Sequence, residues 1–404
     1  EAAAELAGID LRELRARTLV VGYPILPLLE QIGRRSPEAA RHLHWGATTQ
    51  DIMDTGLALQ AGRAFDRVAV LMQGLGDQVA ETAAAHRATA MPGRTHAQPA
   101  VPVTFGGKLA VVLAELTRHR ERLAAARARL TVVQLFGAAG TAAALGHASR
   151  DVRHRVAEKL GLGAVDVPWH TARDSVAEAA LVLAAVAGTC GKLAREVIEL
   201  SRPEIGEVRE EGGHHRGASS TMPQKANPIG SEAVVGLSLL AAQQSGALLA
   251  ALQGTHERSA GEWQVEWDAL PLTFTATAGA LAWTRQVLSG LRVFPERMRA
   301  NLDGEGGLVM AEAAMIAVAE VTGRATAHEA VTEASGLVRA EGVTLREALE
   351  RTLDREILEA VQPLDAVLDP DAYLGETQAI VTAALEGWGR RATPPSPAAG
   401  TAPR

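Results

Sequence analysis

The sequence predicts an all-α fold in which long helices pack side by side. Ala, Leu and Val dominate an apolar share of 47%, and aromatic residues make up only 3%. Ala and Leu are strong helix formers, and this composition favours close-packed helices over sheets. Over residues 105–133, apolar residues return every three or four positions, which is the spacing of one face of a helix. The 404 residues are enough for two or three domains.

Polar or proline-rich segments divide the helical pattern into successive elements. Shorter helices are expected before residue 43, over 148–160 and over 295–390. Long helices are expected over residues 56–89, 105–133, 173–203, 230–253 and 265–290, which is about as many as a bundle needs. The Pro- and Ala-rich residues 392–404 are expected to form a disordered tail. The chain begins inside a helical pattern without a methionine, so we expect a preceding segment to be missing.

Composition and charge argue against several classes of protein. The 40 basic and 47 acidic residues are interspersed, so no nucleic-acid partner is expected. No run reaches the ~18 apolar residues of a membrane span, and no signal peptide is visible, which favours a cytoplasmic protein without a membrane partner. The single cysteine, Cys190, excludes an intrachain disulfide and is expected in the core. His214 and His215 have no third ligand nearby, so no metal is expected.

Three segments between helices are rich in Ser, Thr, His, Gln, Asn or Lys and sparse in Asp and Glu. They are HLHWGATTQDIMDTG (42–56), MPGRTHAQPAVPVT (91–104) and GASSTMPQKANPIGSE (217–232). Their neutral donors, together with Arg94 and Lys225, suit an anionic small ligand. A purely structural interpretation stays open, in which Thr48 or Thr49 caps a helix and Arg94 forms a structural ion pair.

The third segment resembles the signature of the fumarase/aspartase superfamily, Ser-Ser-x-Met-Pro-x-Lys-x-Asn-Pro. The matching residues are Ser219, Ser220, Met222, Pro223, Lys225, Asn227 and Pro228. GRTHAQPAVPVTFG (93–106) resembles the superfamily's Gly-x-Thr-His-x-Gln block, and HWGATTQDIMDT (44–55) resembles its Thr-Ser-x-Asp block. The resemblance covers about residues 10 to 390.

This resemblance implies a subunit of three helical domains. We expect an N-terminal helical domain over residues 1–89, a central long-helix domain over 90–292 and a C-terminal helical domain over 293–391. Five long helices from each central domain would form the twenty-helix core of a homotetramer. Each active site would combine the three blocks from three subunits, and residues 212–222 would form a mobile loop that closes over the substrate.

The implied reaction is a β-elimination from a dicarboxylate, usually releasing fumarate, and it needs no cofactor. Loss of the proton beside a carboxylate gives a dianionic aci-carboxylate, which fixed donors must stabilise. By resemblance, Ser219 is the general base, Lys225 and Asn227 stabilise the dianion, and His96 is the general acid. The implied substrate-binding residues are His44, Thr48, Thr49, Gln50, Arg94, Thr95, Gln98, Ser220 and Met222.

The branch within the superfamily stays open between two chemistries. FGAAGTAAALG (136–146), PWHTARD (168–174) and HERSAGEWQVEWDALP (256–271) resemble the 3-carboxy-cis,cis-muconate cycloisomerases. Bacterial cycloisomerases, however, carry an aromatic residue at the position of His96. This difference favours a fumarate-releasing lyase, for example one that converts nitrosuccinate to fumarate and nitrite, and leaves lactonisation as the alternative.

Two further alternatives have less support from the residues. Adenylosuccinate lyases carry an Arg at the position of Ala226 and a His-Asp pair near LVVGY (19–23), so a nucleotide substrate would lose contacts here. An inactive structural homologue would keep the bundle and lose the site. The joint presence of Ser219, Lys225 and His96 argues against it.

Overall fold

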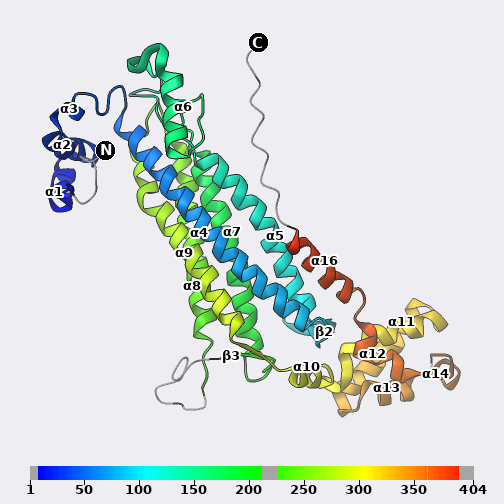
Figure 1. The fold of residues 1–404 in the computed structure, drawn as a ribbon. Coiled ribbons are helices and arrows are strands. Elements are labelled where there is room, and N and C mark those ends of the chain that lie inside the picture. The colour runs from blue at the N-terminus through cyan, green and yellow to red at the C-terminus, as the bar shows by residue number, and fades with distance from the viewer. Residues whose placement is uncertain (1–7, 212–221, 223–224, 362, 391–404) are drawn as a thin grey trace, which may run out of the picture. The chain divides into compact units, whose positions relative to one another are not determined.

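The structure is a computed structural model that describes residues 8–211, 222, 225–361 and 363–390. Within these residues, five long helices dominate the fold (Figure 1). They are α4 (Thr49–Ala85), α5 (Phe105–Leu130), α7 (Asp174–Leu200), α8 (Ile229–Ala250) and α9 (Glu262–Ser289). The all-α expectation is confirmed. The expected tail, residues 392–404, lies outside the described part of the chain.

Contacts along the chain divide it into two compact units. Unit 1 consists of Glu1–Val70, Glu121–Ala187 and Leu239–Ala278, and unit 2 of Leu71–Arg120, Gly188–Ser238 and Gly279–Arg404. Each long helix therefore contributes one stretch to each unit. The three domains expected from the superfamily stay a prediction.

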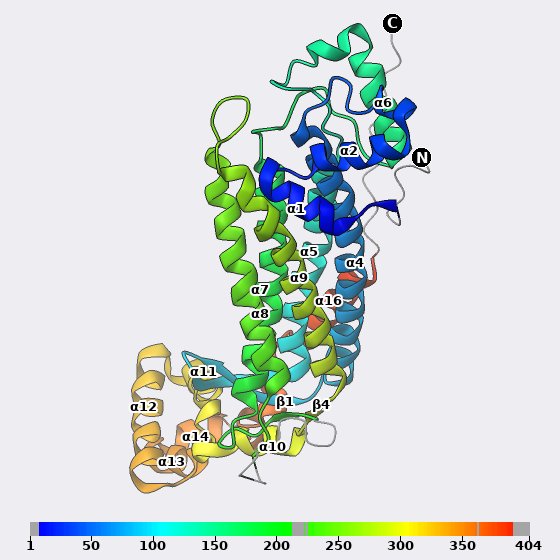
Figure 2. The ribbon, with the colours of Figure 1, turned by 90° about the vertical axis from the view of Figure 1, so that its left-hand side faces the viewer.

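In unit 1 the helix segments run side by side (Figures 1 and 2). Their buried side chains are mostly apolar. The ring of Phe65 on α4 meets the ring of Phe274 on α9 edge-on, with centroids 5.0 Å apart. On α9, the Thr277 hydroxyl donates to the backbone oxygen of Leu183 on α7, over 3.2 Å. Short elements at the helix ends complete the unit: α1 (Leu11–Val21), α2 (Ile25–Arg35), α3 (Pro37–Ala40), η3 (Ala143–Ala148), α6 (Ser149–Leu160) and η4 (Ala251–Gln253).

In unit 2, small residues allow the long helices to approach closely. A Cβ atom at Gly191 on α7 would lie 2.4 Å from the hydroxyl of Ser238 on α8, so a larger residue at position 191 would require Ser238 to move. Buried polar side chains on these helices pair with each other: His119 Nε2 lies 3.0 Å from the Thr189 hydroxyl. Burial raises the pKa of the Cys190 thiol to about 12, which makes this cysteine an inert core residue.

A β-hairpin stands where the sequence analysis expected only a proline-rich interruption. β1 (Ala90–Thr95) pairs antiparallel with β2 (Gln98–Thr104). Proline cannot donate to a strand ladder, so a segment with three prolines does not indicate strands by its sequence. Each strand of a two-stranded sheet has one free edge, and prolines are tolerated there. A second short pair, β3 (Val208–Glu210) with β4 (Leu291–Val293), was also not predicted.

The C-terminal helices in unit 2 surround a core of their own. Buried members include Leu302, Met310, Ala327 and Leu349. The elements are α10 (Pro295–Leu302), η5 (Gly304–Met310), α11 (Ala311–Thr322), α12 (Arg324–Glu341), α13 (Leu345–Thr352), α14 (Arg355–Val361), α15 (Leu364–Val367) and η6 (Pro370–Tyr373). The last helix, α16 (Thr377–Gly389), has no residue in this core and contacts α4, where the Trp388 indole N–H donates to Asp77 over 2.8 Å.

Two described stretches are long and apolar enough to cross a membrane by length and composition alone. They are Asp174–Leu200 and Ile229–Gln253, which correspond to the helices expected over 173–203 and 230–253. In the first stretch 61% of the apolar window is buried, as in a core helix, but in the second only 22% is. The second stretch, which contains α8, therefore leaves an apolar face exposed.

Candidate active site

The block resembling Thr-Ser-x-Asp forms the N-terminal end of α4 in unit 1. α4 begins at Thr49, and the Thr48 N–H donates to Asp51 Oδ2 over 3.0 Å. The first N–H groups of a helix lack partners inside it, and a carboxylate in the first turn satisfies one and complements the helix dipole. The expected position of Asp51 at a helix N-terminus is confirmed.

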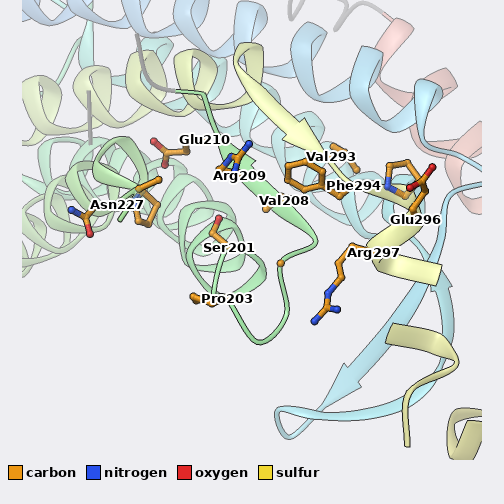
Figure 3. A pocket seen from close by; sticks show the side chains of 14 residues that line it. Ser201, Pro203, Val208, Arg209, Glu210, Asn227, Val293, Phe294, Glu296 and Arg297 are labelled. Carbon is orange, nitrogen blue, oxygen red and sulfur yellow. The ribbon is translucent and has the colours of Figure 1, made fainter. Parts of the chain in front are cut away.

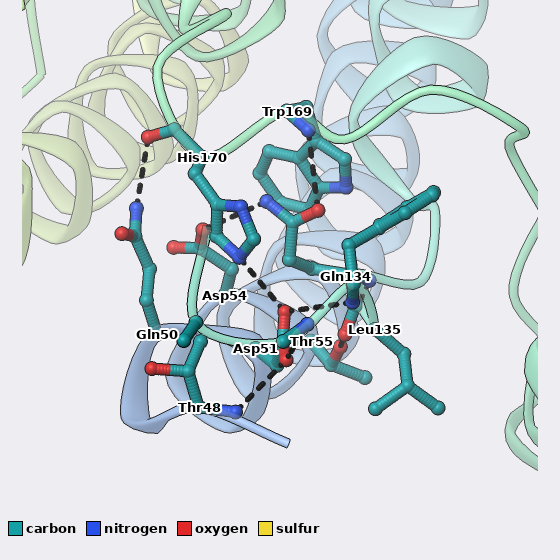
Figure 4. A network of polar contacts seen from close by, with 12 residues as sticks. Thr48, Gln50, Asp51, Asp54, Thr55, Gln134, Leu135, Trp169 and His170 are labelled. Carbon is teal, nitrogen blue, oxygen red and sulfur yellow. Dashed lines mark hydrogen bonds and ion pairs between the residues drawn. The ribbon is translucent and has the colours of Figure 1, made fainter. Parts of the chain in front are cut away.

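The Asp51 carboxylate is fully buried and accepts four hydrogen bonds (Figure 4). Besides Thr48, its donors are the backbone N–H groups of Phe136 (3.1 Å) and Gly137 (2.8 Å) and His170 Nε2 (2.8 Å). Burial alone would raise the pKa of Asp51, but the bonds from His170 and the three N–H groups outweigh it and lower the pKa. Asp51 is therefore ionised near neutral pH, and His170 Nε2 must carry the proton that it donates.

Gln50 lies in the same network and is only 1% exposed. Its Nε2 donates to the backbone oxygen of His170 over 2.9 Å, and its Oε1 accepts from Arg258 Nε over 3.1 Å. Both ends of the amide are occupied by protein groups. The direct contact of Gln50 with substrate stays a prediction.

Arg258 joins this network and was not among the site residues predicted from the sequence. Its guanidinium bonds to two neutral acceptors, Gln50 Oε1 and the backbone oxygen of Ala138 (3.0 Å). Within the described residues no carboxylate forms an ion pair with it. A guanidinium with only neutral partners keeps its charge available for an anion.

The remaining predicted residues of this block lie at the surface end of α4. Thr48 and Thr49 are half-buried. His44 is also half-buried and has a φ of 60°, a conformation that non-glycine residues seldom adopt. Such strain often marks functional positions, which agrees with the predicted substrate contact of His44.

The second block forms the β1–β2 hairpin in unit 2 and places its key residues at the tip. Thr95 pairs with Gln98, and His96 and Ala97 form the two-residue turn with φ values of 50° and 63°. A type I′ turn needs positive φ at both positions and usually contains Asn-Gly. His96, Thr95 and Gln98 are all exposed. The hairpin therefore presents the predicted general acid on a strained, outward turn.

Arg94 on β1 is part of a structural ion pair. Its guanidinium donates twice to the buried carboxylate of Glu207, over 3.0 and 2.7 Å. Asn301 donates to the same carboxylate over 2.7 Å. The guanidinium is therefore neutralised inside the subunit. This supports the structural ion pair left open in the sequence analysis, and substrate binding by Arg94 stays a prediction.

The third block leads into α8 in unit 2. Lys225 is exposed, Asn227 is half-buried, and Met222 is 43% exposed. The backbone N–H of Lys225 donates to Met222 O over 3.0 Å. Ser219 and Ser220 lie outside the described residues, so their predicted roles rest on the sequence alone.

An open cleft of about 730 Å³ borders this block (Figure 3). Asn227 lines it together with Arg209 and Phe294. Glu210 lines it too, but its carboxylate accepts from the N–H groups of Gly230 and Ser231 and so stabilises the N-terminus of α8. The volume suits a small organic ligand.

The described contacts thus gather the predicted residues into separate groups. His44, Thr48, Thr49 and Gln50 belong to unit 1, whereas the hairpin residues, Lys225 and Asn227 belong to unit 2. In the described part of the chain, no three His, Cys, Asp or Glu side chains cluster as a metal ion would require.

Comparison with known proteins places the chain in a family. A family model described as "Lyase" matches residues 15–242, which is more than half of the chain. The chain belongs to this lyase family. A second model, "Adenylosuccinate lyase C-terminus", matches residues 307–384. The fumarase/aspartase superfamily inferred from the three motifs is confirmed.

Within this lyase family, the chain is similar to cycloisomerases along nearly its whole length. It is 42% identical to the 3-carboxy-cis,cis-muconate cycloisomerase of Pseudomonas aeruginosa, over 95% of the chain and 85% of that protein. The crystal structure of the 3-carboxy-cis,cis-muconate lactonizing enzyme from Pseudomonas putida matches with a TM-score of 0.88 and 39% identity, covering 96% and 88% of the two chains. The nitrosuccinate lyase of Streptomyces davaonensis is 37% identical over 91% of the chain and 79% of that enzyme.

Proposed function

We propose that this lyase cyclises 3-carboxy-cis,cis-muconate to a lactone. The observation that carries the proposal is the similarity to cycloisomerases along 95% of the chain. These relatives favour the alternative from the sequence analysis over its first expectation, a fumarate-releasing elimination. Arg258 adds support, because a tricarboxylate needs one more positive charge than a dicarboxylate, and its guanidinium has no carboxylate partner among the described residues.

Lactonisation and β-elimination share their critical intermediate. In lactonisation, a carboxylate oxygen adds to one carbon of the diene, and a C–O bond replaces a carbon–carbon π bond. The electron pair moves to the carboxylate at the far end as an aci-carboxylate, and a proton then adds to the carbon beside it. The enzyme must stabilise two negative charges on one group, as in elimination.

The predicted residues fit these steps. Lys225 and Asn227 would donate to the aci-carboxylate, and Ser219 would deliver the proton to carbon, the reverse of its role as a base in elimination. Thr48, Thr49, Thr95 and Gln98 would bind carboxylates. The attacking carboxylate is already an anion, so this reaction does not require His96 to protonate a leaving group.

His96 favours a second candidate function. An exposed imidazole on a strained turn suits protonation of a leaving group in a fumarate-releasing lyase. Nitrosuccinate is the first such substrate to test, because the nitrosuccinate lyase is among the relatives.

A substrate panel distinguishes the two candidates. Purified enzyme would be mixed with 3-carboxy-cis,cis-muconate, nitrosuccinate, aspartate, argininosuccinate, adenylosuccinate and malate. Loss of diene absorbance with lactone formation is the expected result, and fumarate would be followed separately. The Ser219→Ala protein, purified in parallel, reports any contaminating lyase. Fumarate from one succinyl compound, without lactone, would replace the proposal with elimination.

We also propose that the protein works as a homotetramer with sites shared between subunits. α8 supports this, because its apolar side chains Leu239, Leu240 and Leu249 are 54%, 42% and 48% exposed. Exposed apolar surface of this kind marks an interface. Dicarboxylates and tricarboxylates are metabolites of the cell interior, so we place the enzyme in the cytoplasm.

The Leu239→Glu variant is expected to dissociate the assembly, since a charge would be buried at the α8 interface without a partner. Light scattering coupled to gel filtration would show a smaller particle and lower activity. Leu160→Glu, which charges a 39% exposed leucine outside α8, serves as the matched control. An unchanged tetramer for Leu239→Glu would remove α8 from the interface.

A further inference from the structure

A segment outside the three motif blocks carries three buried side chains, Trp169, His170 and Arg173, and bonds to the start of α4. The segment is PWHTARD, residues 168–174 in unit 1, and both of its halves are anchored. On one side of His170, the Trp169 N–H donates to Gln134 Oε1 (3.2 Å), and its indole N–H donates to Val133 O (3.3 Å). On the other side, Arg173 donates to Asp54. His170 therefore sits on a rigid support.

From this support, His170 makes two contacts with the N-terminal end of α4 (Figure 4). Its ring donates to Asp51, and its backbone oxygen accepts from Gln50. Asp51 in turn accepts from the Thr48 N–H. His170, which lies 120 positions away from Gln50 along the chain, therefore bonds to Gln50 directly and to Thr48 through Asp51.

The contact between His170 and Gln50 continues to the guanidinium of Arg258, which has no carboxylate partner among the described residues. Gln50 carries the link from His170 to Arg258 Nε, and Arg258 also donates to Ala138 O. Ala138 adjoins Gly137, whose N–H donates to Asp51. The bonds form a closed ring that runs through His170, Gln50, Arg258, residues 137–138 and Asp51. Movement of His170 would shift Arg258 and Thr48 together.

We propose that His170 is a positioning residue for substrate carboxylates, acting on Thr48 through Asp51 and on Arg258 through Gln50. Its side chain is only 3% exposed, so it does not touch substrate itself. This proposal rests on the proposed function in one respect, the binding of substrate carboxylates by Thr48, Thr49 and Arg258. The proposal also gives Gln50 an indirect part in substrate recognition, although its amide is buried.

The test compares His170→Leu with His170→Gln, since a glutamine Nε2 can replace the histidine donor to Asp51. Loss of a donor to a buried charged acceptor is expected to lower kcat/KM about 10- to 100-fold in His170→Leu. The His170→Gln variant should stay within about threefold of wild type, because the hydrogen bond to Asp51 is kept. His154→Leu, a 52% exposed histidine of the same unit, is the control and should leave kcat/KM unchanged.

A double-mutant cycle separates positioning from a general structural effect. If His170 acts through Arg258, the His170→Leu/Arg258→Met double variant should lose little more than the larger single loss. If the kcat/KM loss of the double variant equals the product of the two single losses, the link to Arg258 is overturned. Should His170→Leu fail to fold by circular dichroism, Gln50→Met breaks the same link without touching Asp51, and the cycle is repeated with it.

The kinetic arm uses whichever panel compound the wild type converts. Turnover of a succinyl compound instead of 3-carboxymuconate rejects the proposed function alone. Wild-type kcat/KM in folded His170→Leu rejects the positioning role alone. If no panel compound is converted, calorimetric titration with propane-1,2,3-tricarboxylate replaces the kinetics. Binding that weakens about 10-fold or more in His170→Leu and recovers in His170→Gln would then support the role, and any other pattern would overturn it.

Discussion

Ser219→Ala should lower kcat by about 10²- to 10⁴-fold, the range that proton transfer by a positioned side chain contributes. Ser219 belongs to the Ser-Ser-x-Met-Pro-x-Lys-x-Asn-Pro motif, and in the proposed reaction it moves the proton at carbon. Without its oxygen, neither lactonisation nor elimination can complete the proton step at the normal rate. The measurement is kcat at saturating substrate, with circular dichroism and thermal unfolding to establish an intact fold.

Ser220→Ala is the matched control for this variant, because it removes a hydroxyl from the neighbouring residue. Ser220 is predicted to bind substrate, so its loss should act mainly on KM. Equal kcat losses for the two serines would contradict the assignment of Ser219 as the proton carrier. Unchanged kcat for Ser219→Ala would remove it from the mechanism altogether.

Arg173→Met should destabilise the protein by about 3–5 kcal/mol, the effect expected when a buried ion cluster loses one partner. The Arg173 side chain is 5% exposed and lies between two buried carboxylates. It donates to Asp54 over 2.9 and 3.1 Å and to Glu266 over 2.8 Å. Trp263 adds an indole N–H bond to Asp54 over 3.1 Å. Without the guanidinium, two negative charges would face each other in an apolar surrounding.

The same variant should gain stability as the pH falls. Burial raises the pKa of Glu266 even in the wild type, although Arg173 opposes the rise. In Arg173→Met only the raising effects, burial and the Asp54 charge, remain, so the pKa rises further. A folded-state pKa above the unfolded value means that the folded state binds more protons, and the free energy of unfolding then increases as pH decreases towards the unfolded pKa of about 4.3.

Urea unfolding at pH 7.5 and pH 5.5 measures both effects. Arg129→Met provides the control, because the Arg129–Glu178 pair in the same unit is 53% and 38% exposed. Exposed pairs contribute only about 0–1 kcal/mol. If the two arginine variants unfold at the same urea concentration, the Asp54–Arg173–Glu266 cluster contributes no more than a surface pair.

Much of the fold follows from the sequence because helix periodicity is a local property. The run over 105–133 predicts α5 to within a few residues, since each apolar position reports on the same helix face. The β1–β2 hairpin was missed for an equally local reason. Pro92, Pro99 and Pro102 disfavour strands in general, but both strands of this two-stranded sheet are edge strands, where proline is tolerated.

The site is less visible in the sequence because its bonds join distant residues. Gln50 and Arg94 belong to motif blocks, but only their contacts with His170 and Glu207 reveal that both side chains are already occupied. Arg258 shows the reverse case. Nothing local separates it from other arginines in the chain, and its uncompensated charge appears only when its partners prove to be an amide and a backbone carbonyl.

The separate core of the C-terminal helices affects how the amino-acid sequence of this protein can evolve. Among the described residues, Ala90 is the one buried member of that core outside residues 302–364. Substitutions there can be compensated by neighbours within a short stretch of chain. Each of the five long helices instead contributes to both units, so one altered face must be matched at several distant places. Sequence drift is therefore expected to be fast in the C-terminal helices and slow in the long ones.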